Sequence, residues 1–391
     1  MTRPTSTTSS LTRRTFNRGV ASLPLLGLAS SLSAEETTRP LHLPKDPARG
    51  IREGWTVAVF PDTQNYAKYG KNQKNFERMC QWVLEHLDAW RIGLVMHEGD
   101  FVEQNNIAEG GGRGWGDQHS KSQWESAKRA LERLEGQVPM IFATGNHDYG
   151  IRNAETRETQ FNDYFGMTDN KLVSDGQGGG ILIEAGQNAA GQQTLENAAY
   201  EVRLPDGRNL LVVSLEWGPR REAVHWAKQL VEQDRFRQHT GILLVHDFIT
   251  PESKRDGQDG NRKRSGNPHT YPTGKTGNTH DGEDLWQALV HDAPQFQLVL
   301  NGHEMGSHVG RRTDPNALGM PVHQMLFNAQ GMGGGSAEKG NGGDGWIRLL
   351  TFEPDGVTLT VRTFSPLKLD EGKLPWWDHP SWCFSLPIQP A

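Results

Sequence analysis

Short apolar segments of strand length alternate with amphipathic segments of helix length along most of this chain. The apolar runs lie at 55–60, 92–96, 138–142, 209–215, 242–245 and 296–300. Segments with the apolar spacing of a helix lie between them, at 75–90, 122–134, 222–233 and 284–290. Strands that alternate with helices of this length predict an α/β fold.

The C-terminal part of the chain has a different pattern. Strand-length runs at 322–327, 346–352, 357–364 and 382–386 follow one another without a helical segment between them. Pro354-Asp355-Gly356 is typical of a hairpin turn between two of these runs. Since no linker separates this part, we predict a single domain over 51–391, preceded by a Pro- and charge-rich linker at 34–50.

Four long polar loops interrupt the alternation. They are predicted at 104–118, 174–198, 250–281 and 331–345. Structureless loops longer than about 12–15 residues are uncommon and are often functional or disordered. Three of the four directly follow a strand end that carries acids, amides or histidines.

The N-terminal segment, residues 1–33, has the composition of an export signal. It contains four arginines and no acidic residue, and it includes the apolar stretch 20–29, which is too short to span a bilayer. The run Thr12-Arg13-Arg14-Thr15-Phe16 resembles the twin-arginine signal. We therefore expect the twin-arginine export machinery as a partner, a periplasmic or extracellular protein, and no stable membrane insertion.

Charge and cysteine content exclude two further possibilities. Four of the 41 basic residues and none of the 47 acidic ones lie in 1–33, so the remaining chain has a formal net charge of −10. A strongly acidic chain has no electrostatic reason to bind bulk nucleic acid. A protein folded before export folds in a reducing compartment, so we expect no disulfide between Cys80 and Cys383.

Polar side chains follow five of the apolar runs at the point where each run ends. The five segments are Asp62-Thr63-Gln64, His97-Glu98-Gly99-Asp100, Gly145-Asn146-His147-Asp148, His246-Asp247 and Asn301-Gly302-His303-Glu304. In an open α/β sheet, ligands bind outside the carboxyl ends of the strands. Carboxylate, amide and imidazole groups without a thiolate indicate a site for divalent Mn, Fe or Zn. Each segment alone is equally typical of a turn, an N-cap or a buried histidine.

Together these segments resemble the motifs of the calcineurin-like metallophosphoesterase family. The family has successive blocks D-x-H or D-x-Q, G-D, G-N-H-D/E, a lone His, and G-H-x-H. This chain has Asp62-x-Gln64, Gly99-Asp100, Gly145-Asn146-His147-Asp148, His246 and Gly302-His303. The resemblance runs from Val57 to about His303 and implies a four-layer α/β/β/α sandwich of two mixed sheets flanked by helices.

The resemblance also implies roles for these residues. Asp100 would bridge two divalent ions (Mn, Fe, Zn or Mg), one completed by Asn146, His246 and His303 and the other by Asp62 and Gln64. A metal-bound water would then hydrolyse a small-molecule or oligomeric phosphate ester, either a monoester or a diester. His147 would give a hydrogen bond or proton to the phosphoryl or leaving oxygen. Asp148 would keep His147 oriented and cationic.

The chain departs from the family pattern at two positions. Gln64 stands where the family often has histidine, and Met305 stands where the last block has its second histidine. An ion held by Asp62, Gln64 and Asp100 would have only oxygen ligands, which favours Mn, Mg or Fe(II) over Zn and predicts weaker binding. Glu304, His308 or His323 would fill the gap if the loop folds back, and a surface position is the simpler alternative for each. His97 is either a neighbour of the ligands or a core histidine.

Two alternatives concern substrate and activity. A basic cluster in the loop after His246 would either receive an anionic substrate or be solvated; it comprises Lys254, Arg255, Arg262, Lys263 and Arg264.

The chain is predicted to be a metallophosphoesterase. The alternatives are a degenerate family member that binds a phosphorylated ligand with little turnover, and a metal-assisted hydrolase of a non-phosphate ester.

Overall fold

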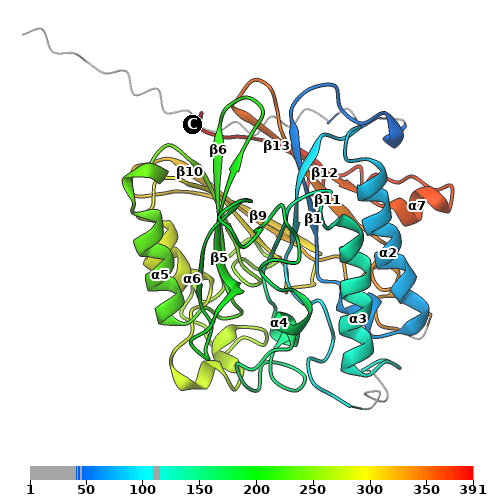
Figure 1. Cartoon of the computed structure of the whole chain (residues 1–391), viewed down its shortest axis with the longest axis horizontal. Coiled ribbons are helices and arrows are strands. Elements are labelled where there is room, and N and C mark those ends of the chain that lie inside the picture. The colour runs from blue at the N-terminus through cyan, green and yellow to red at the C-terminus, as the bar shows by residue number, and fades with distance from the viewer. Residues whose placement is uncertain (1–40, 42, 45, 109–114, 338, 391) are drawn as a thin grey trace, which may run out of the picture. The chain divides into compact units, whose positions relative to one another are not determined.

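The computed structural model describes residues 41, 43–44, 46–108, 115–337 and 339–390 (Figure 1). The predicted export signal at 1–33 lies outside these residues. Among the helices that are described, none is both long enough and apolar enough to cross a membrane. Both cysteines are buried, and neither forms a disulfide.

A six-stranded sheet carries the first three predicted strands. Its order is β13-β12-β11-β1-β2-β3. The strands are β1 (Trp55–Phe60), β2 (Ile92–His97), β3 (Met140–Phe142), β11 (Ile347–Phe352), β12 (Thr358–Phe364) and β13 (Phe384–Pro387). β1, β2 and β3 are parallel, and β11, β12 and β13 add to β1 as antiparallel strands. The C-terminal strands therefore extend the same sheet, as the absence of a separating linker indicated.

A seven-stranded sheet carries the remaining strands, in the order β4-β5-β6-β7-β8-β10-β9. The strands are β4 (Leu182–Gln187), β5 (Gln193–Arg203), β6 (Asn209–Ser214), β7 (Thr240–Leu244), β8 (Phe296–Asn301), β9 (Val309–Pro315) and β10 (Pro321–Phe327). β6, β7, β8 and β10 are parallel, whereas β4, β5 and β9 pair in antiparallel fashion. Both sheets are mixed: the parallel strands form one end of the six-stranded sheet and the middle of the seven-stranded sheet.

Helices cover the outer face of each sheet (Figure 1). The α-helices are α1 (Gln64–Ala67), α2 (Gly70–Glu85), α3 (Ser120–Leu131), α4 (Phe161–Tyr164), α5 (Arg221–Val231), α6 (Gly282–Leu285) and α7 (Pro366–Asp370). α6 continues as a π-helical turn over Trp286–Val290. Apolar side chains of α2 at Phe76, Met79 and Val83 repeat at helical spacing and pack into the core of the six-stranded sheet.

The parallel strands of the seven-stranded sheet are buried on both faces. Leu210 and Val212 of β6 belong to the hydrophobic cluster shared with the six-stranded sheet. Their neighbours Leu211 and Val213 belong to the cluster that includes α5 and α6. Successive side chains of a strand point to opposite faces, which explains why these strands are continuous apolar runs. The prediction of an α/β fold is confirmed, as two mixed sheets with helices packed on them.

Several predicted boundaries are wrong. The segment 174–198, predicted as a loop, contains β4 and the start of β5. β4 is an edge strand with only two buried residues, so it lacks the apolar run on which the prediction relied. The edge strand β9 was missed for the same reason, because five of its seven residues are not buried. The helix predicted at 75–90 is α2, which begins at Gly70 and ends at Glu85.

The segment predicted as a linker contacts the core through its second half. The carbonyl oxygen of Pro47 accepts a hydrogen bond from the Trp90 indole at 2.7 Å. That of Pro44 accepts one from the Trp376 indole at 2.9 Å. A short 3-10 turn, Pro47–Arg49, presents Pro47 to the core. These two bonds satisfy the buried indole N–H groups, which would otherwise lack a partner.

Candidate metal centre

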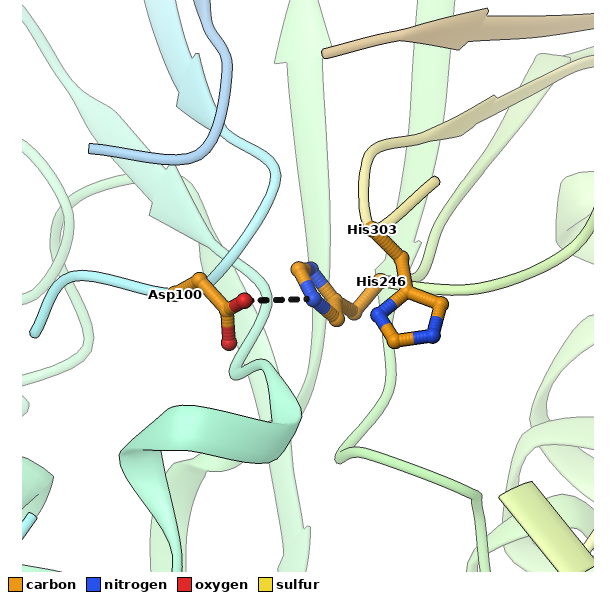
Figure 2. Close-up of side chains that lie close together, drawn as sticks. All are labelled: Asp100, His246 and His303. Atoms are coloured by element: carbon orange, nitrogen blue, oxygen red, sulfur yellow. Dashed lines mark ion pairs between the residues drawn. The ribbon is translucent and has the colours of Figure 1, made fainter. Parts of the chain in front are cut away.

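The carboxyl ends of the parallel strands of both sheets lie together. Asp100 follows β2, His246 follows β7 and His303 follows β8. One ligand atom from each of the three lies within 4.8 Å of the others (Figure 2). Since the three come from two sheets and are far apart in sequence, only the packing of the sheets brings them together.

Asp100 occupies the middle of this group. Its Oδ2 lies 3.2 Å from His246 Nε2, the ion pair drawn in Figure 2. The same oxygen accepts a hydrogen bond from Gln64 Nε2 at 3.0 Å, and Oδ1 accepts one from the backbone N–H of His147 at 2.9 Å. Asp100 thus touches groups from the ends of β1, β3 and β7, which is the position a bridging ligand requires.

The turn that presents Asp100 is strained and glycine-dependent. Asp100 has φ +57° and Gly99 has φ +98°. A Cβ at Gly99 would lie 2.7 Å from the backbone nitrogen of Gly145 and 2.7 Å from His246 Nδ1. Glycine is therefore required here for close approach of three segments as well as for its backbone conformation.

The two imidazoles are each fixed by a backbone carbonyl. His246 Nδ1 lies 2.6 Å from the carbonyl oxygen of Glu98, and His303 Nε2 lies 2.8 Å from that of Gly266. A carbonyl only accepts, so each of these nitrogens carries the proton. The lone pairs of neutral rings then lie on His246 Nε2 and His303 Nδ1, which makes those atoms the available metal ligands.

Two amide side chains predicted as ligands have a buried oxygen without a donor. Gln64 Oε1 and Asn146 Oδ1 accept no hydrogen bond. The amide nitrogens are used: Gln64 donates to Asp100, and Asn146 donates to Asn153 Oδ1 at 2.5 Å. Buried polar atoms are nearly always paired, so these orphaned acceptor atoms indicate a cation as the missing partner.

Asp62, the remaining predicted ligand, is surrounded by donors. Its Oδ2 accepts from Asn328 Nδ2 at 2.8 Å and from Gln330 Nε2 at 3.1 Å. The backbone N–H of His303 lies 3.2 Å from both Oδ1 and Oδ2. His246 Nε2 is 4.0 Å from Oδ2, so Asp62 also lies beside the imidazole half of the centre.

Charge and burial oppose each other throughout the centre. Burial raises the pKa of Asp62 to about 7, although His246 acts to lower it. Burial alone would lower the pKa of His246, but Asp100 and Asp62 outweigh it and raise it to about 10. Burial would raise the pKa of Asp100, yet His246 and His147 hold it below its usual range. Two carboxylates thus share one cationic imidazole, an arrangement that a divalent ion would balance better.

His147 lies beside this group, with its ring held by two carbonyls. His147 Nδ1 donates to the carbonyl oxygens of Glu103 at 2.8 Å and Arg152 at 3.2 Å. Nε2 is therefore the ring nitrogen left to meet a substrate oxygen. Burial would lower the pKa of His147, but the carboxylates of Asp100 and Glu103 outweigh it and raise it.

Asp148 was expected to keep His147 oriented and cationic. Its charge does help to raise the pKa of His147, but it does not hold the ring. Among the described residues, no hydrogen bond or ion pair joins them. Asp148 instead accepts from the backbone N–H groups of Asp100 and Phe101, each at 2.9 Å, and of Gly145 at 2.8 Å. Its place within the 3-10 turn Asn146–Asp148 directs it toward the backbone of the Gly99-Asp100 turn. Asp148 therefore joins the two ligand-bearing turns and leaves the orientation of His147 to the carbonyls.

His97 is buried and acts within the same framework. Its Nδ1 accepts from the backbone N–H of Gly99 at 3.1 Å, and its Nε2 lies 2.9 Å from Thr63 Oγ1. The ring stacks on Phe101 with centroids 3.9 Å apart. Burial, followed by the charge of His246, lowers the pKa of His97 to about 3. His97 is thus a neutral core histidine that ties the ends of β1 and β2 together.

Each residue considered for the gap at Met305 has another partner. Glu304 Oε1 accepts from Arg264 at 2.7 Å, and His308 Nδ1 lies 3.0 Å from the carbonyl oxygen of Asn328. His323 lies in β10 between Thr313 and the carbonyl oxygen of Pro387. Met305 is itself 49% exposed. None of the three candidates belongs to the group formed by Asp100, His246 and His303.

The basic loop is largely neutralised by nearby acids. Lys254 pairs with Asp259, Arg255 with Glu283 and Asp314, Arg262 with Asp281 and Asp284, and Arg264 with Asp256 and Glu304. Of these pairs, that of Arg264 with Glu304 lies beside His303, whose Nε2 is fixed by the Gly266 carbonyl. The geometry therefore favours a structural role for the cluster over capture of an anionic substrate.

Asn328 and Gln330 are site residues that the sequence reasoning missed. They follow directly after β10, whose apolar run was predicted at 322–327. The rule applied to the other strand ends would have found them, because β10 runs parallel to β8. They were passed over because the resemblance to the family ends near His303.

No family model matches the chain. It is 25% identical over 329 residues to the Uncharacterized protein YvnB of Bacillus subtilis (strain 168), a match that covers 82% of this chain and 20% of YvnB. The chain thus spans about a fifth of the length of this curated relative. Among solved structures it is similar to GAP50, the anchor in the inner membrane complex of Plasmodium, with a TM-score of 0.43 and 10% identity. That match covers 86% of this chain and 90% of GAP50.

Proposed function

We propose that this protein is a metal-dependent phosphoesterase of the calcineurin-like type, which hydrolyses phosphate monoesters or diesters. The observation that carries the proposal is the group of acceptor atoms at the ends of the parallel strands. Gln64 Oε1 and Asn146 Oδ1 are buried without a hydrogen-bond donor. Gln64 contacts Asp100 through its amide nitrogen, and Asn146 adjoins His147, whose backbone N–H donates to Asp100.

The donor set fits divalent cations. Asp100, Asn146, His246 and His303 offer a carboxylate, an amide oxygen and two imidazoles with preset tautomers, which suits Mn, Fe or Zn. Asp62, Gln64 and Asp100 offer oxygen atoms only, which suits Mn, Mg or Fe(II). The proposal therefore includes two ions of different affinity on the two sides of Asp100.

Bound ions would neutralise phosphoryl charge and supply an activated water. His147 would act on the substrate itself, because its Nδ1–H is fixed to two carbonyls and its Nε2 is left for a phosphoryl or leaving oxygen. The neighbouring carboxylates of Asp100 and Glu103 favour the protonated ring that such a donor requires. Asp148 would hold the turn at Asp100 and the turn at His147 together.

The composition of residues 1–33 supports the rest of the proposal. An arginine-rich segment followed by a short apolar stretch favours export through the twin-arginine machinery. The phosphate ester would then be met in the periplasm or outside the cell.

Hydrolysis of a generic aryl phosphate monoester and diester tests this function. Purified protein is assayed with Mn, Fe, Zn and Mg in turn, beside the variants Asp100→Ala and His147→Ala. We expect release of the aryl alcohol by the wild type and a loss of at least 100-fold in either variant. His291→Ala, which removes an exposed histidine remote from the centre, is the matched control and should keep full activity. Metal-loaded wild type that hydrolyses neither ester would contradict the proposal.

A second candidate is a degenerate member that binds a phosphorylated ligand with little turnover. The observation that favours it is Met305, a half-exposed thioether where the family has a second histidine. Metal counting separates the two functions, since near two ions per chain supports hydrolysis and one or none supports binding alone.

A further inference from the structure

We propose that Asn328 and Gln330 complete the Asp62 half of the centre and create an oxygen-only site for the second ion. The two amides hold Asp62 Oδ2, so that Asp62 Oδ1, Gln64 Oε1 and Asp100 remain for the cation. This inference rests on the metal centre of the proposed function, and it names the residues of this chain that hold Asp62 on the side where the second histidine is missing.

The position of the two residues follows from the sheet. β10 runs parallel to β8, and residues Asn328 and Gln330 emerge at the same sheet edge as His303. Asn328 Nδ2 donates to the carbonyl oxygen of His303 at 2.9 Å as well as to Asp62 Oδ2. Asn328 therefore connects the ligand-bearing turn after β8 to the carboxylate after β1.

The orientation of both amides is set by further hydrogen bonds. Asn328 Oδ1 accepts from the backbone N–H of Gln330 at 3.0 Å. Gln330 Oε1 accepts from Asn65 Nδ2 at 3.3 Å, and Asn65 Nδ2 also donates to the Gln330 carbonyl at 2.9 Å. Since each amide oxygen already has a donor, each amide nitrogen is directed at Asp62. The exposed fractions of Asn328 and Gln330 are 0% and 8%, so water does not substitute readily for these bonds.

The two oxygens of Asp62 are left unequal by this arrangement. Oδ2 has donors from Asn328, Gln330 and the His303 backbone, which uses its two lone pairs. Oδ1 has only the backbone N–H that it shares with Oδ2, at 3.2 Å. Oδ1 therefore keeps a lone pair for a cation, and the carboxylate is held in one orientation for it.

Gln64 supplies the second free oxygen on this side. Its Nε2 is anchored on Asp100 Oδ2 at 3.0 Å, and its Oε1 is buried without a donor. A neutral amide network on Asp62 adds no positive charge of its own, unlike a protonated histidine. The resulting site is rich in oxygen and predicts Mn(II), Mg(II) or Fe(II) with lower affinity than the imidazole site.

Mn(II) titration of the purified full chain without substrate tests the inference. Free Mn(II) is followed by electron paramagnetic resonance for wild type, Gln330→Met and Asn328→Ala. Wild type should bind one ion tightly and a second more weakly, and each variant should weaken the second ion about 10–100-fold while keeping the first. Gln330→Met retains the size of the side chain and decides the question if Asn328→Ala does not fold.

Gln324→Met is the matched control. Gln324 lies in β10, the strand that precedes Gln330, is also buried and donates to the Asp314 carboxylate at 2.8 Å. It should bind both ions as wild type does. A folded Gln330→Met variant with unchanged second-ion affinity overturns the inference, as does a wild type that binds only one ion.

Failure here is distinguishable from failure of the proposed function. A chain that binds two ions in an amide-dependent manner but hydrolyses no phosphate ester upholds the inference and contradicts the phosphoesterase. If the wild type hydrolyses esters but both variants bind the second ion as tightly as the wild type does, the inference alone is contradicted.

Discussion

The two sheets contribute different chemistry to the same centre. The six-stranded sheet supplies oxygen: Asp62 and Gln64 after β1, Asp100 after β2 and Asn146 after β3. The seven-stranded sheet supplies the imidazoles of His246 and His303. Each imidazole needs only one carbonyl to set its tautomer, whereas Asp62 is held by three donors from the opposite sheet. The oxygen half is thus held mainly by side-chain amides of the opposite sheet. The imidazole half is held by backbone carbonyls, that of Glu98 at the end of β2 for His246 and that of Gly266 for His303.

This difference predicts that the two halves respond differently to substitution. Variants of the imidazole half should remove a tight ion, and variants of the oxygen half should affect a weak one. Asp100 touches both halves, so its substitution is the strongest test of whether the two halves differ.

Asp100→Ala should have the largest effect, because it removes the carboxylate that we propose as the ligand shared by both halves. We expect loss of both ions at micromolar metal, which corresponds to at least a 100-fold fall in affinity for each. Metal content by mass spectrometry after gel filtration measures this. Retention of one full ion by folded Asp100→Ala protein would show that the halves are independent.

Substitutions on either side of Asp100 should separate the halves. His246→Ala is expected to lose the tight ion, with a fall of about 100-fold, whereas Gln64→Ala should weaken only the second ion, by about 10-fold. Calorimetric titration with Zn and then Mn resolves the two events. Equal effects of the two variants on both ions would remove the distinction between the halves.

Asp148→Ala tests how the oxygen half is held. The substitution leaves the buried backbone N–H groups of Asp100, Phe101 and Gly145 without their acceptor. We expect a loss of about 2–5 kcal/mol in the free energy of unfolding, measured by urea denaturation. Glu155→Ala is a useful control, since Glu155 accepts backbone bonds in an exposed loop and should cost much less. A similar small loss for both would show that Asp148 is not a structural clamp.

A substitution of His323 should have the smallest effect of those considered, and it compares a histidine outside the centre with His246. Like His246, His323 lies on the seven-stranded sheet, and its Nε2 donates to the carbonyl of Pro387 at 2.6 Å, but its Nδ1 already accepts from Thr313 at 2.8 Å. No lone pair remains for an ion. Burial lowers the pKa of His323, although the Pro387 carbonyl acts to raise it.

The sign of the pH effect follows from that lowered pKa. Below the ordinary histidine pKa of about 6.5, the unfolded chain binds a proton that the folded His323 does not, so this residue reduces stability as pH falls. The contribution is at most about 1.4 kcal/mol per pH unit. For His323→Gln, the free energy of unfolding, measured by urea denaturation, should change less steeply with pH between about pH 7 and pH 5. An unchanged slope would show that His323 is charged when folded.

Much of the scaffold followed from local pattern. The parallel strands β1, β2, β6, β7 and β8 are continuous apolar runs because both of their faces are buried, so their positions and the polar residues at their ends were predictable. The edge strands β4 and β9 were not, because an exposed face allows polar residues and removes the signal. The resemblance to a known family then indicated which strand ends belong to one centre.

The sequence by itself determined which side chains stand at the strand ends, since the spacing of apolar residues is a local property of the chain. Only the tertiary structure decided their partners. Asn328 meets Asp62 across 266 residues, and Arg264 meets Glu304 across 40. Asp148 likewise accepts hydrogen bonds from the turn at Asp100 and makes none with the ring of its neighbour His147. Hydrogen bonds over such separations depend on how the two sheets pack, and no local pattern in the chain records that packing.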